Sequence, residues 1–316
     1  AYISDADLTE YTDRVLKQVQ RMVDAGKQSP TEFEVITAIA LLYFYEKGAD
    51  YVVLEVGLGG RGDSTNVCKA PLISVITSIS YDHTDRLGDT LAKIAWEKSG
   101  IIKDGCPVVT SAKAPEALEV IERTAAEHHA LFFETRRIPY KIKEQGLDGS
   151  CFDVDFQGVL FEDLRISMVG AHQIENAIAA LAAINLLEER GKVRIQKDKL
   201  YSGLQKAKQI GRFEVLTAPD AKPVVIIDGA HNPDGAKVLR DAMKTFCPSQ
   251  RILMVTGMLA DKDTTGILRS FRDITTDFIA TEPVNPRSMT KETLKDALQA
   301  QGARCLALLE PKAAVE

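Results

Sequence analysis

The stretch YVVLEVGLGGRGDSTN, residues 51–66, joins a continuous apolar run to a loop that is rich in glycine. The run at 51–56 shows no alternation of polar and apolar residues, which is typical of a strand buried on both faces of a parallel sheet. Residues 72–79, LISVITSI, have the same character. Because ligands of open parallel sheets bind outside the carboxyl ends of the strands, the polar residues after these runs are the first candidates for a functional site.

Helix patterns flank the two runs. Ser4 with Asp7 and Thr31 with Glu34 resemble capping boxes, which predicts two helices before residue 51, the second ending near Gly48. The elements expected after the second run are a helix opened at 89–90 and running to 99, a strand at 106–111, a helix at 115–128, a small antiparallel sheet within 132–169, and helices at 172–189 and 197–208.

A second series of strand and helix patterns begins after Gly211. Its members are FEVLTA, VVIIDGA, a helix from Pro233, RILMVTGM, DFIATEP, a helix from Thr290, and CLALLE. A chain of 316 residues is long enough for two domains. We therefore expect an α/β protein with a parallel-sheet domain at 1–210 and a smaller α/β domain at 211–316, the boundary lying near residues 209–212.

The charge, the apolar runs and the cysteines of the chain limit the kinds of partner and environment that it can have. The 39 basic and 45 acidic side chains give a net charge of −6, which argues against a broad nucleic-acid surface but leaves room for one basic nucleotide pocket. No apolar run reaches the length of a membrane span, about 20 residues. The five cysteines are scattered without a CxxC pair, which is typical of reduced thiols in a cytoplasm and not of a disulfide framework or zinc site.

Glu55 and His83 follow the two apolar runs. Glu55 lies between Leu54 and Val56, where a charge needs a partner such as a metal ion. The alternative is a strand-end glutamate beside a flexible loop. His83 lies just past the second run, in SYDHT. A single histidine is more often structural than a ligand, but its position parallel to Glu55 favours a shared site.

Lys98 shares a helix face with apolar residues. In TLAKIAWEKSG the spacing puts it on the side of Leu91, Ile94 and Ala95, which should face the sheet. The lysine can extend to water from the last helical turn, an arrangement that the pattern alone favours. The alternative is a desolvated, neutral amine, which can take up carbon dioxide to form an anionic carbamate.

A second junction lies at DGAHNPDGA, where Asp228 ends an apolar run. Asn232 is placed to cap the following helix, and Pro233 suits its first turn. Asp228 and His231 should then meet where the strand passes into the helix, although a capped loop that happens to contain a histidine is the alternative. Arg212, between the two series of elements, either reaches a ligand or is a solvated arginine at a hinge.

Seven stretches, taken in order, resemble folylpolyglutamate synthase/dihydrofolate synthase, a family of the Mur ligase superfamily. They are LEVGLGGRGDSTN, SVITSISYDHTDRLGDTLAKIAWEKSGIIK, VGAHQIENA, GRFEV, DGAHNPDGA, GMLADKD and EPVNPRSM. The resemblance implies an ATPase-type Mur-ligase central domain, incomplete here, followed by a Rossmann-like glutamate-ligase domain. It also implies an ATP-dependent ligase that activates a carboxylate of folate or dihydropteroate as an acyl phosphate, which the amine of L-glutamate attacks.

The resemblance assigns roles to residues by position. The positions that match magnesium-site residues of the family are Glu55, His83 and Lys98, the last as a carbamylated lysine. Asn176, Arg212 and Asp228 match nucleotide-binding residues, and His231 matches a catalytic residue near glutamate and phosphate. The implied cofactors are ATP and magnesium, the latter at two sites. We expect a cytoplasmic monomer that acts on small molecules and binds neither nucleic acid nor membrane.

The match to the family is incomplete. The motif GxxxxGK[ST] of a phosphate loop occurs nowhere in the chain, and Gly62 stands where the family has a larger residue. Since the chain also lacks an initial Met and a recognisable terminus, we expect both ends to be cut and both domains to be incomplete. Two alternatives stay open: another Mur-type ligase that acts on a nucleotide-linked cell-wall precursor, and a nonenzymatic fragment that cannot turn over ATP.

Overall fold

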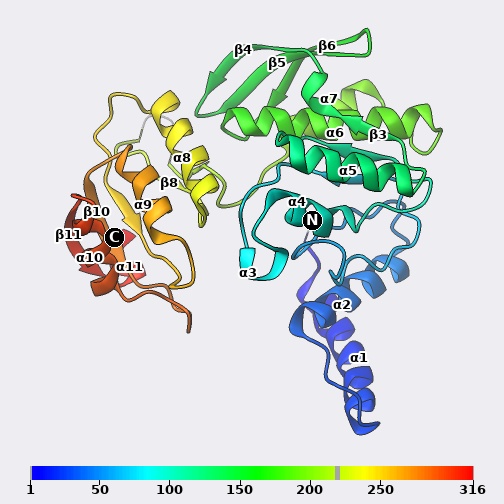
Figure 1. Cartoon of the computed structure of the whole chain (residues 1–316), viewed down its shortest axis with the longest axis horizontal. Coiled ribbons are helices and arrows are strands. Elements are labelled where there is room, and N and C mark those ends of the chain that lie inside the picture. The colour runs from blue at the N-terminus through cyan, green and yellow to red at the C-terminus, as the bar shows by residue number, and fades with distance from the viewer. Residues whose placement is uncertain (1, 218–220, 316) are drawn as a thin grey trace. The chain divides into compact units, whose positions relative to one another are not determined.

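The computed structural model describes residues 2–217 and 221–315 (Figure 1). These residues form two compact units, and each unit collects several segments of the chain. The first draws on Ala1–Ile79, His83–Val108 and Ala112–Phe133, and the second on Ser80–Asp82, Val109–Ser111 and Glu134–Glu316. The expected domain division after residue 210 stays a prediction.

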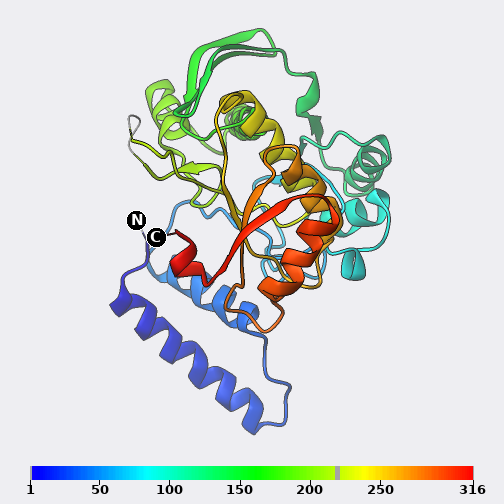
Figure 2. The same ribbon diagram turned by 90° about the vertical axis from the view of Figure 1, so that its left-hand side faces the viewer.

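Two helices open the first unit, as the capping patterns predict. They are α1 (Asp5–Asp24) and α2 (Glu32–Glu46), and they lie side by side and antiparallel (Figure 2). The Thr31 hydroxyl accepts a hydrogen bond from the Glu34 amide, and the Glu34 carboxylate accepts one from the Thr31 amide, so this capping box is confirmed. The helix ends where Gly48 takes a positive φ of 65°.

The first sheet has the connectivity of a parallel α/β unit. Its elements are β1 (Ser74–Ile76), the short helix α3 (Thr84–Leu87), α4 (Leu91–Ser99), β2 (Val108–Thr110), α5 (Pro115–Glu127) and β3 (Phe132–Glu134), and the strand order is β1-β2-β3. Each crossover between neighbouring strands contains a helix, which is the connection that parallel strands need. The fold class is therefore α/β, and the helices expected at 90–99 and 115–128 are confirmed.

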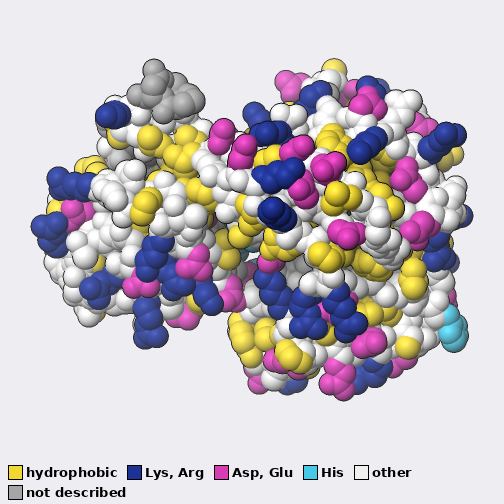
Figure 3. Space-filling model, turned by 90° about the horizontal axis from the view of Figure 1, so that it is seen from above, with side chains coloured by type: hydrophobic (Ala, Val, Ile, Leu, Met, Phe, Trp, Pro, Cys, Tyr) yellow, Lys and Arg dark blue, Asp and Glu magenta, His cyan; other side chains and the backbone are white. Residues whose placement is uncertain are grey.

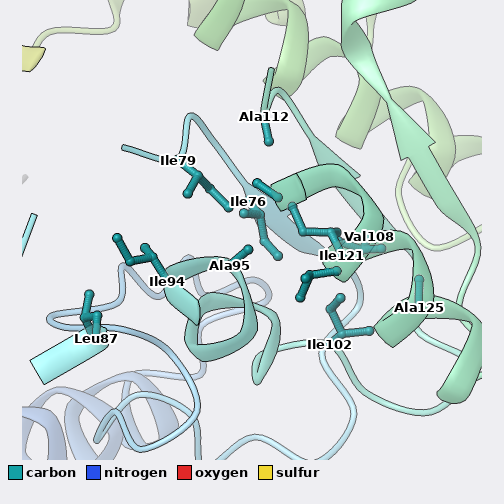
Figure 4. Packing of buried hydrophobic residues seen from close by; sticks show 12 residues of the cluster. Ile76, Ile79, Leu87, Ile94, Ala95, Ile102, Val108, Ala112, Ile121 and Ala125 are labelled. Carbon is teal, nitrogen blue, oxygen red and sulfur yellow. The ribbon is translucent and has the colours of Figure 1, made fainter. Parts of the chain in front are cut away.

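The core of the first unit lies between this sheet and its two crossover helices. Ile76 of β1, Ile94 of α4 and Ile121 of α5 are buried within one cluster (Figure 4). Ala95, next to Ile94, is fully buried, so the apolar face that the spacing predicts for α4 does face the core.

The two apolar runs behave differently from the prediction. Residues 51–56 form no strand, and Val53 is 95% exposed. Only Ser74–Ile76 of the second run is a strand, and Val75 at its centre is 38% exposed, so it is not buried on both faces. A strand needs a neighbour that supplies hydrogen bonds and covers its faces, and none of the described residues forms a ladder with 51–56.

An antiparallel sheet begins the long segment of the second unit, where the alternating pattern predicts it. Its strands are β4 (Tyr140–Gly146), β5 (Gly149–Phe156) and β6 (Val159–Ile166), preceded by the one-turn helix η1 (Thr135–Arg137). Helix α6 (Ala171–Glu189) packs against β5 and β6, and α7 (Lys197–Lys206) packs against β6 (Figure 1). Both helices are confirmed.

A second parallel sheet follows in the order β11-β10-β9. The elements of this region are β7 (Glu214–Val215), β8 (Ile226–Ile227), α8 (Pro233–Phe246), β9 (Met254–Thr256), α9 (Thr264–Arg272), β10 (Asp277–Thr281), α10 (Lys291–Ala300), β11 (Arg304–Leu309) and α11 (Pro311–Val315). Fully buried Leu268, Phe278 and Leu294 lie in one core between the sheet and its helices.

Two features of this region depart from the sequence pattern. Helix α9 was not among the expected elements, although Asp263 caps it by accepting a hydrogen bond from the Gly266 amide. The expected strand at VVIIDGA is reduced to β8, which pairs antiparallel with β7 and lies outside the β9–β11 sheet. The short pairing leaves Ile227 exposed.

The surface agrees with the charge balance of the chain. On the face drawn in Figure 3, Lys and Arg side chains are interspersed with Asp and Glu side chains. This mixed pattern differs from the one-signed field of a surface that tracks a phosphate backbone. Within the described ranges, every helix is too short or too polar to span a lipid bilayer.

Replacing Ile94 with alanine tests the core of the first unit. The side chain is fully buried, so Ile94→Ala should lower the free energy of unfolding by about 2–5 kcal/mol. Lys93→Ala is the matched control on the same helix, because an exposed ion pair such as that of Lys93 with Asp89 contributes little to stability. Urea unfolding followed by circular dichroism measures both, and equal losses would contradict the packing described here.

Candidate functional site

Asp228 joins two loops at the end of β8. Its carboxylate accepts hydrogen bonds from the amides of Phe213 and Ala230, each at 2.8 Å. The Gly229 amide donates to the Gly211 carbonyl at 2.7 Å and strengthens the same junction. Two residues predicted to bind a nucleotide, Asp228 and Arg212, are thereby held in neighbouring loops.

The Arg212 side chain extends from this junction into solvent. The residue is exposed, and a Cβ built on Gly229 would lie 3.9 Å from Arg212 Nη1, which shows how closely the guanidinium approaches the Asp228 loop. The Asp228 carboxylate is bound by backbone amides. The Arg212 guanidinium beside it can therefore bind an anion such as phosphate. The junction therefore combines a cation with a carboxylate that accepts hydrogen bonds.

His172 belongs to the same neighbourhood and was not among the residues predicted from the sequence. Burial lowers the pKa of His172, the charges of Asp228 and Glu175 act in the opposite direction, and Arg212 lowers it further. The ring sits over Gly170, where an added Cβ would lie 2.7 Å from His172 Cε1. The signal was present in VGAHQIENA, in which a glycine stands two positions before a histidine in the first turn of a helix.

Asn176, the third residue predicted to bind a nucleotide, lies one turn after His172 on α6. Positions four apart share a face of a helix, so Asn176 and His172 point to the same side. Its amide nitrogen donates to the Gln173 side chain at 3.1 Å, while the residue stays exposed. The charges of Asp228 and Arg212 thus act on His172, and Asn176 lies one helical turn after it on α6.

Asp82 is the centre of a second polar group in the second unit. Its carboxylate accepts a hydrogen bond from Asn232 Nδ2 at 2.8 Å and one from Lys262 Nζ at 3.3 Å, and it lies 3.5 Å from His231 Nε2. Asn232 Oδ1 also accepts from the Gly235 amide at 2.7 Å, which confirms the predicted helix cap. One asparagine therefore caps α8 and binds Asp82.

The contacts of His231 define its tautomer. Nδ1 lies 2.9 Å from the Gly229 carbonyl oxygen. Because a carbonyl oxygen only accepts, Nδ1 carries the hydrogen, and Nε2 of the neutral ring keeps its lone pair. His231 is therefore arranged to accept a proton at a defined atom.

Asp82 and Lys262 are residues that sequence reasoning missed. They are separated by 180 positions, and each belongs to a stretch quoted for other reasons, SYDHT and GMLADKD. The Lys262 side chain is only 15% exposed, so its charge needs the Asp82 carboxylate. No local pattern in either stretch predicts that Asp82 and Lys262 lie close together.

The three residues predicted to bind magnesium, Glu55, His83 and Lys98, lie in three different local environments. Glu55 is exposed and follows no strand, in contrast to the expectation, and His83 is exposed with a φ of 47° at the start of α3. Lys98 is partly buried in the last turn of α4. Within residues 2–217 and 221–315, no three His, Cys, Asp or Glu side chains gather where they would hold a metal ion. The assignment of magnesium to Glu55, His83 and Lys98 stays a prediction.

The pH dependence of stability tests the environment of His172. Its pKa in the folded chain is lowered from 6.5, so the unfolded chain binds the proton first as the pH falls. The stability that the neutral ring contributes is fully present above pH 6.5 and is lost as the pH falls from 6.5 through the lower folded value. His172→Gln should therefore flatten this loss of Tm in thermal unfolding scans. The control is His129→Asn at an exposed position, and parallel curves for wild type and His172→Gln would contradict the burial.

Comparisons with known proteins identify the family of the chain. Residues 6–184 match the Mur ligase middle domain, and residues 211–316 match the glutamate ligase domain of Mur ligases. The dihydrofolate synthase/folylpolyglutamate synthase of Bacillus subtilis is 39% identical over 274 residues, which are 86% of this chain and 63% of the relative. The Escherichia coli enzyme of the same name is 33% identical over 93% of this chain and 69% of its own length.

A solved structure extends the comparison to three dimensions. The folylpolyglutamate synthase of Mycobacterium tuberculosis, complexed with ADP, superposes with a TM-score of 0.88 at 28% identity and covers 99% of this chain and 70% of its own. The chain therefore spans about two thirds of the relatives that it matches. On these matches, the chain belongs to the folylpolyglutamate synthase/dihydrofolate synthase family of Mur ligases.

Proposed function

We propose that the full-length protein is an ATP-dependent ligase that adds L-glutamate to folates and also joins glutamate to dihydropteroate. Membership of the family and 39% identity to the Bacillus subtilis relative support this activity. The observation that carries the proposal is that the charges of Arg212 and Asp228 act on His172, which shares a helix face with Asn176. Asn176, Arg212 and Asp228 match nucleotide-binding residues of the family. The chain spans 63% of that relative, so the activity belongs to the full-length protein.

The proposed reaction has two steps. An acceptor carboxylate oxygen takes the γ-phosphoryl group of ATP, which leaves ADP and an acyl phosphate. The nitrogen of glutamate then bonds to the acyl carbon, the bond from that carbon to the phosphate oxygen breaks, and the nitrogen releases a proton. Arg212 suits the phosphate groups because a guanidinium binds phosphate oxygens in pairs. Asp228 suits the hydroxyl groups of the nucleotide because a carboxylate accepts their hydrogens.

His231 suits the proton transfer of the second step. Its hydrogen-bearing Nδ1 faces the Gly229 carbonyl, and Nε2 offers a lone pair. Asp82 holds Asn232, the next residue in the chain, and thereby restrains the loop that carries His231. A positioned base of this kind accelerates a reaction by about 10²–10⁴-fold.

Magnesium supplies charge neutralisation for the phosphate groups when it is bound. We assign its ligands to Glu55, His83 and Lys98, with Lys98 carbamylated, and expect two magnesium sites. We propose carbamylation for Lys98, which lies one turn after fully buried Ile94 on α4. Carbamylation turns a cation that repels magnesium into an anion.

The broader organisation of the proposal follows the family. We assign residues 1–210 to the ATP and magnesium domain and residues 211–316 to the glutamate-ligase domain. We place the protein in the cytoplasm as a monomer, in accord with its scattered free cysteines.

A ligase assay on the full-length protein tests the proposed function. With ATP, L-glutamate and either tetrahydrofolate or dihydropteroate, the protein should release ADP and extend the acceptor by glutamate. His231→Ala should cut turnover by about 10²-fold if His231 acts as the positioned base. Turnover only with a nucleotide-linked cell-wall precursor would show that the protein is another Mur-type ligase. The absence of ADP release with every acceptor would favour a nonenzymatic protein.

Carbamylation of Lys98 has its own test. Carbon NMR with labelled bicarbonate on full-length, magnesium-loaded protein should show a carbamate signal that is absent in Lys98→Ala. Lys98→Arg should lose most activity too, because a guanidinium keeps its charge and forms no carbamate. Full activity of Lys98→Arg would end the assignment, and short carboxylates such as acetate should partly restore activity to Lys98→Ala.

A further inference from the structure

The glycine-rich loop at residues 57–66, here called the strap, lies against the last turn of α4. The Arg61 amide donates a hydrogen bond to the Glu97 carbonyl at 2.8 Å, and Arg61 Nη2 donates to the Trp96 carbonyl at 3.2 Å. Asn66 Nδ2 donates to the Gly100 carbonyl at 3.0 Å and to the Arg61 carbonyl at 3.1 Å. All these residues belong to the first unit.

These bonds satisfy the end of a helix. The last carbonyl groups of an α-helix have no amide partner within the helix and need one from elsewhere. The strap supplies donors to the carbonyls of Trp96, Glu97 and Gly100. The guanidinium also places a positive charge at the helix C-terminus, where the helix dipole favours it. The helix end is thus capped by a loop that is distant in sequence.

The Arg61 guanidinium also stacks on the indole ring of Trp96. Its Cζ lies 3.8 Å from the ring centroid, well within the range of a cation–π contact. Trp96 is 47% exposed, so its ring is not held in the core. The Arg61 guanidinium of the strap covers part of the ring. The planar fork of arginine makes the stack and the carbonyl hydrogen bond together, which a lysine cannot reproduce in full.

Two glycines allow the backbones to approach this closely. A Cβ built on Gly60 would lie 2.9 Å from the carbonyl oxygens of both Glu97 and Lys98. A Cβ built on Gly100 would lie 2.4 Å from Arg61 Cα. Because neither position has room for a side chain, the close contact between strap and helix requires glycine at both positions.

The strap is also braced within itself by Asp63. Its carboxylate accepts hydrogen bonds from the amides of Leu58 and Thr65 at 2.8 and 2.9 Å and from the Thr65 hydroxyl at 2.6 Å. Burial raises the pKa of Asp63, but the hydrogen bonds from Thr65, Leu58 and Gly57 outweigh burial and hold the pKa below its ordinary value. The carboxylate is therefore charged and bonded at neutral pH, and the loop keeps its shape.

We propose that Arg61 and Asn66 are positioning residues for the ligase reaction, which they serve by fixing the helical turn that carries Lys98. The strap begins next to the segment that contains Glu55 and ends on this turn, so it links two residues of the proposed site directly. The core holds α4 through Ile94 and Ala95, whereas the strap holds its last turn. This role rests on the proposed function.

The test combines amide exchange with kinetics on the full-length protein. The variants are Arg61→Ala and Arg61→Lys, with Arg123→Ala on the exposed face of α5 as the matched control. Hydrogen exchange followed by mass spectrometry should be about two- to fivefold faster for Arg61→Ala in peptides covering 58–66 and 96–101. This factor is the one expected from the loss of an exposed cation–π contact. The value of kcat should fall about 10- to 100-fold at unchanged KM for glutamate, because a small misplacement of a reacting group costs that much.

The conservative variant separates positioning from simple folding. Arg61→Lys keeps the charge and one donor, so it should regain part of both the exchange protection and kcat. Asn66→Ala provides a second route if Arg61→Ala does not fold, and it should reproduce the loss of kcat. Arg123→Ala should match wild type in both measurements.

The outcomes distinguish this inference from the proposed function. An active wild type whose Arg61→Ala and Asn66→Ala variants keep the kcat of Arg123→Ala would overturn the positioning role alone. Unchanged exchange of the strap peptides in Arg61→Ala would also overturn it. An inactive wild type would overturn the proposed function and the positioning role with it.

Discussion

The hydrogen bonds that Asp228 accepts from the amides of Phe213 and Ala230 set the geometry of the nucleotide-binding residues. Backbone amides that leave regular structure must be paired, and a carboxylate pairs two of them at once. The pairing keeps Arg212 beside the Asp228 loop, and the charges of both residues act on His172 of α6. Residues proposed to bind one nucleotide thus depend on a junction that the backbone itself requires.

The same principle recurs at other ends of regular elements. Asn232 caps α8 and donates to Asp82, and Arg61 and Asn66 complete the end of α4. In each case the side chain that satisfies a helix terminus also restrains a residue proposed to do chemistry. Local stability and the placement of the site are therefore difficult to change separately.

Much of the fold could be predicted because its signals are local. The capping box at Thr31, the cap at Asn232 and the apolar face of α4 each depend on residues a few positions apart. The run at 51–56 was misjudged because a strand depends on neighbours that no local pattern contains. The meeting of Asp82 with Lys262 was missed for the same reason. Gly62 is a departure from the family that the fold tolerates, since a Cβ there would meet nothing within 4 Å.

Among residues 2–217 and 221–315, strand β1 pairs only with β2 and forms an edge of its sheet. An edge of this kind presents a row of amide and carbonyl groups, and the half-exposed Val75 adds an apolar side chain to it. Another copy of the chain can extend such a sheet by one strand, so self-association should increase with protein concentration. Charged substitutions at Val75 are the natural way to obtain a well-behaved sample.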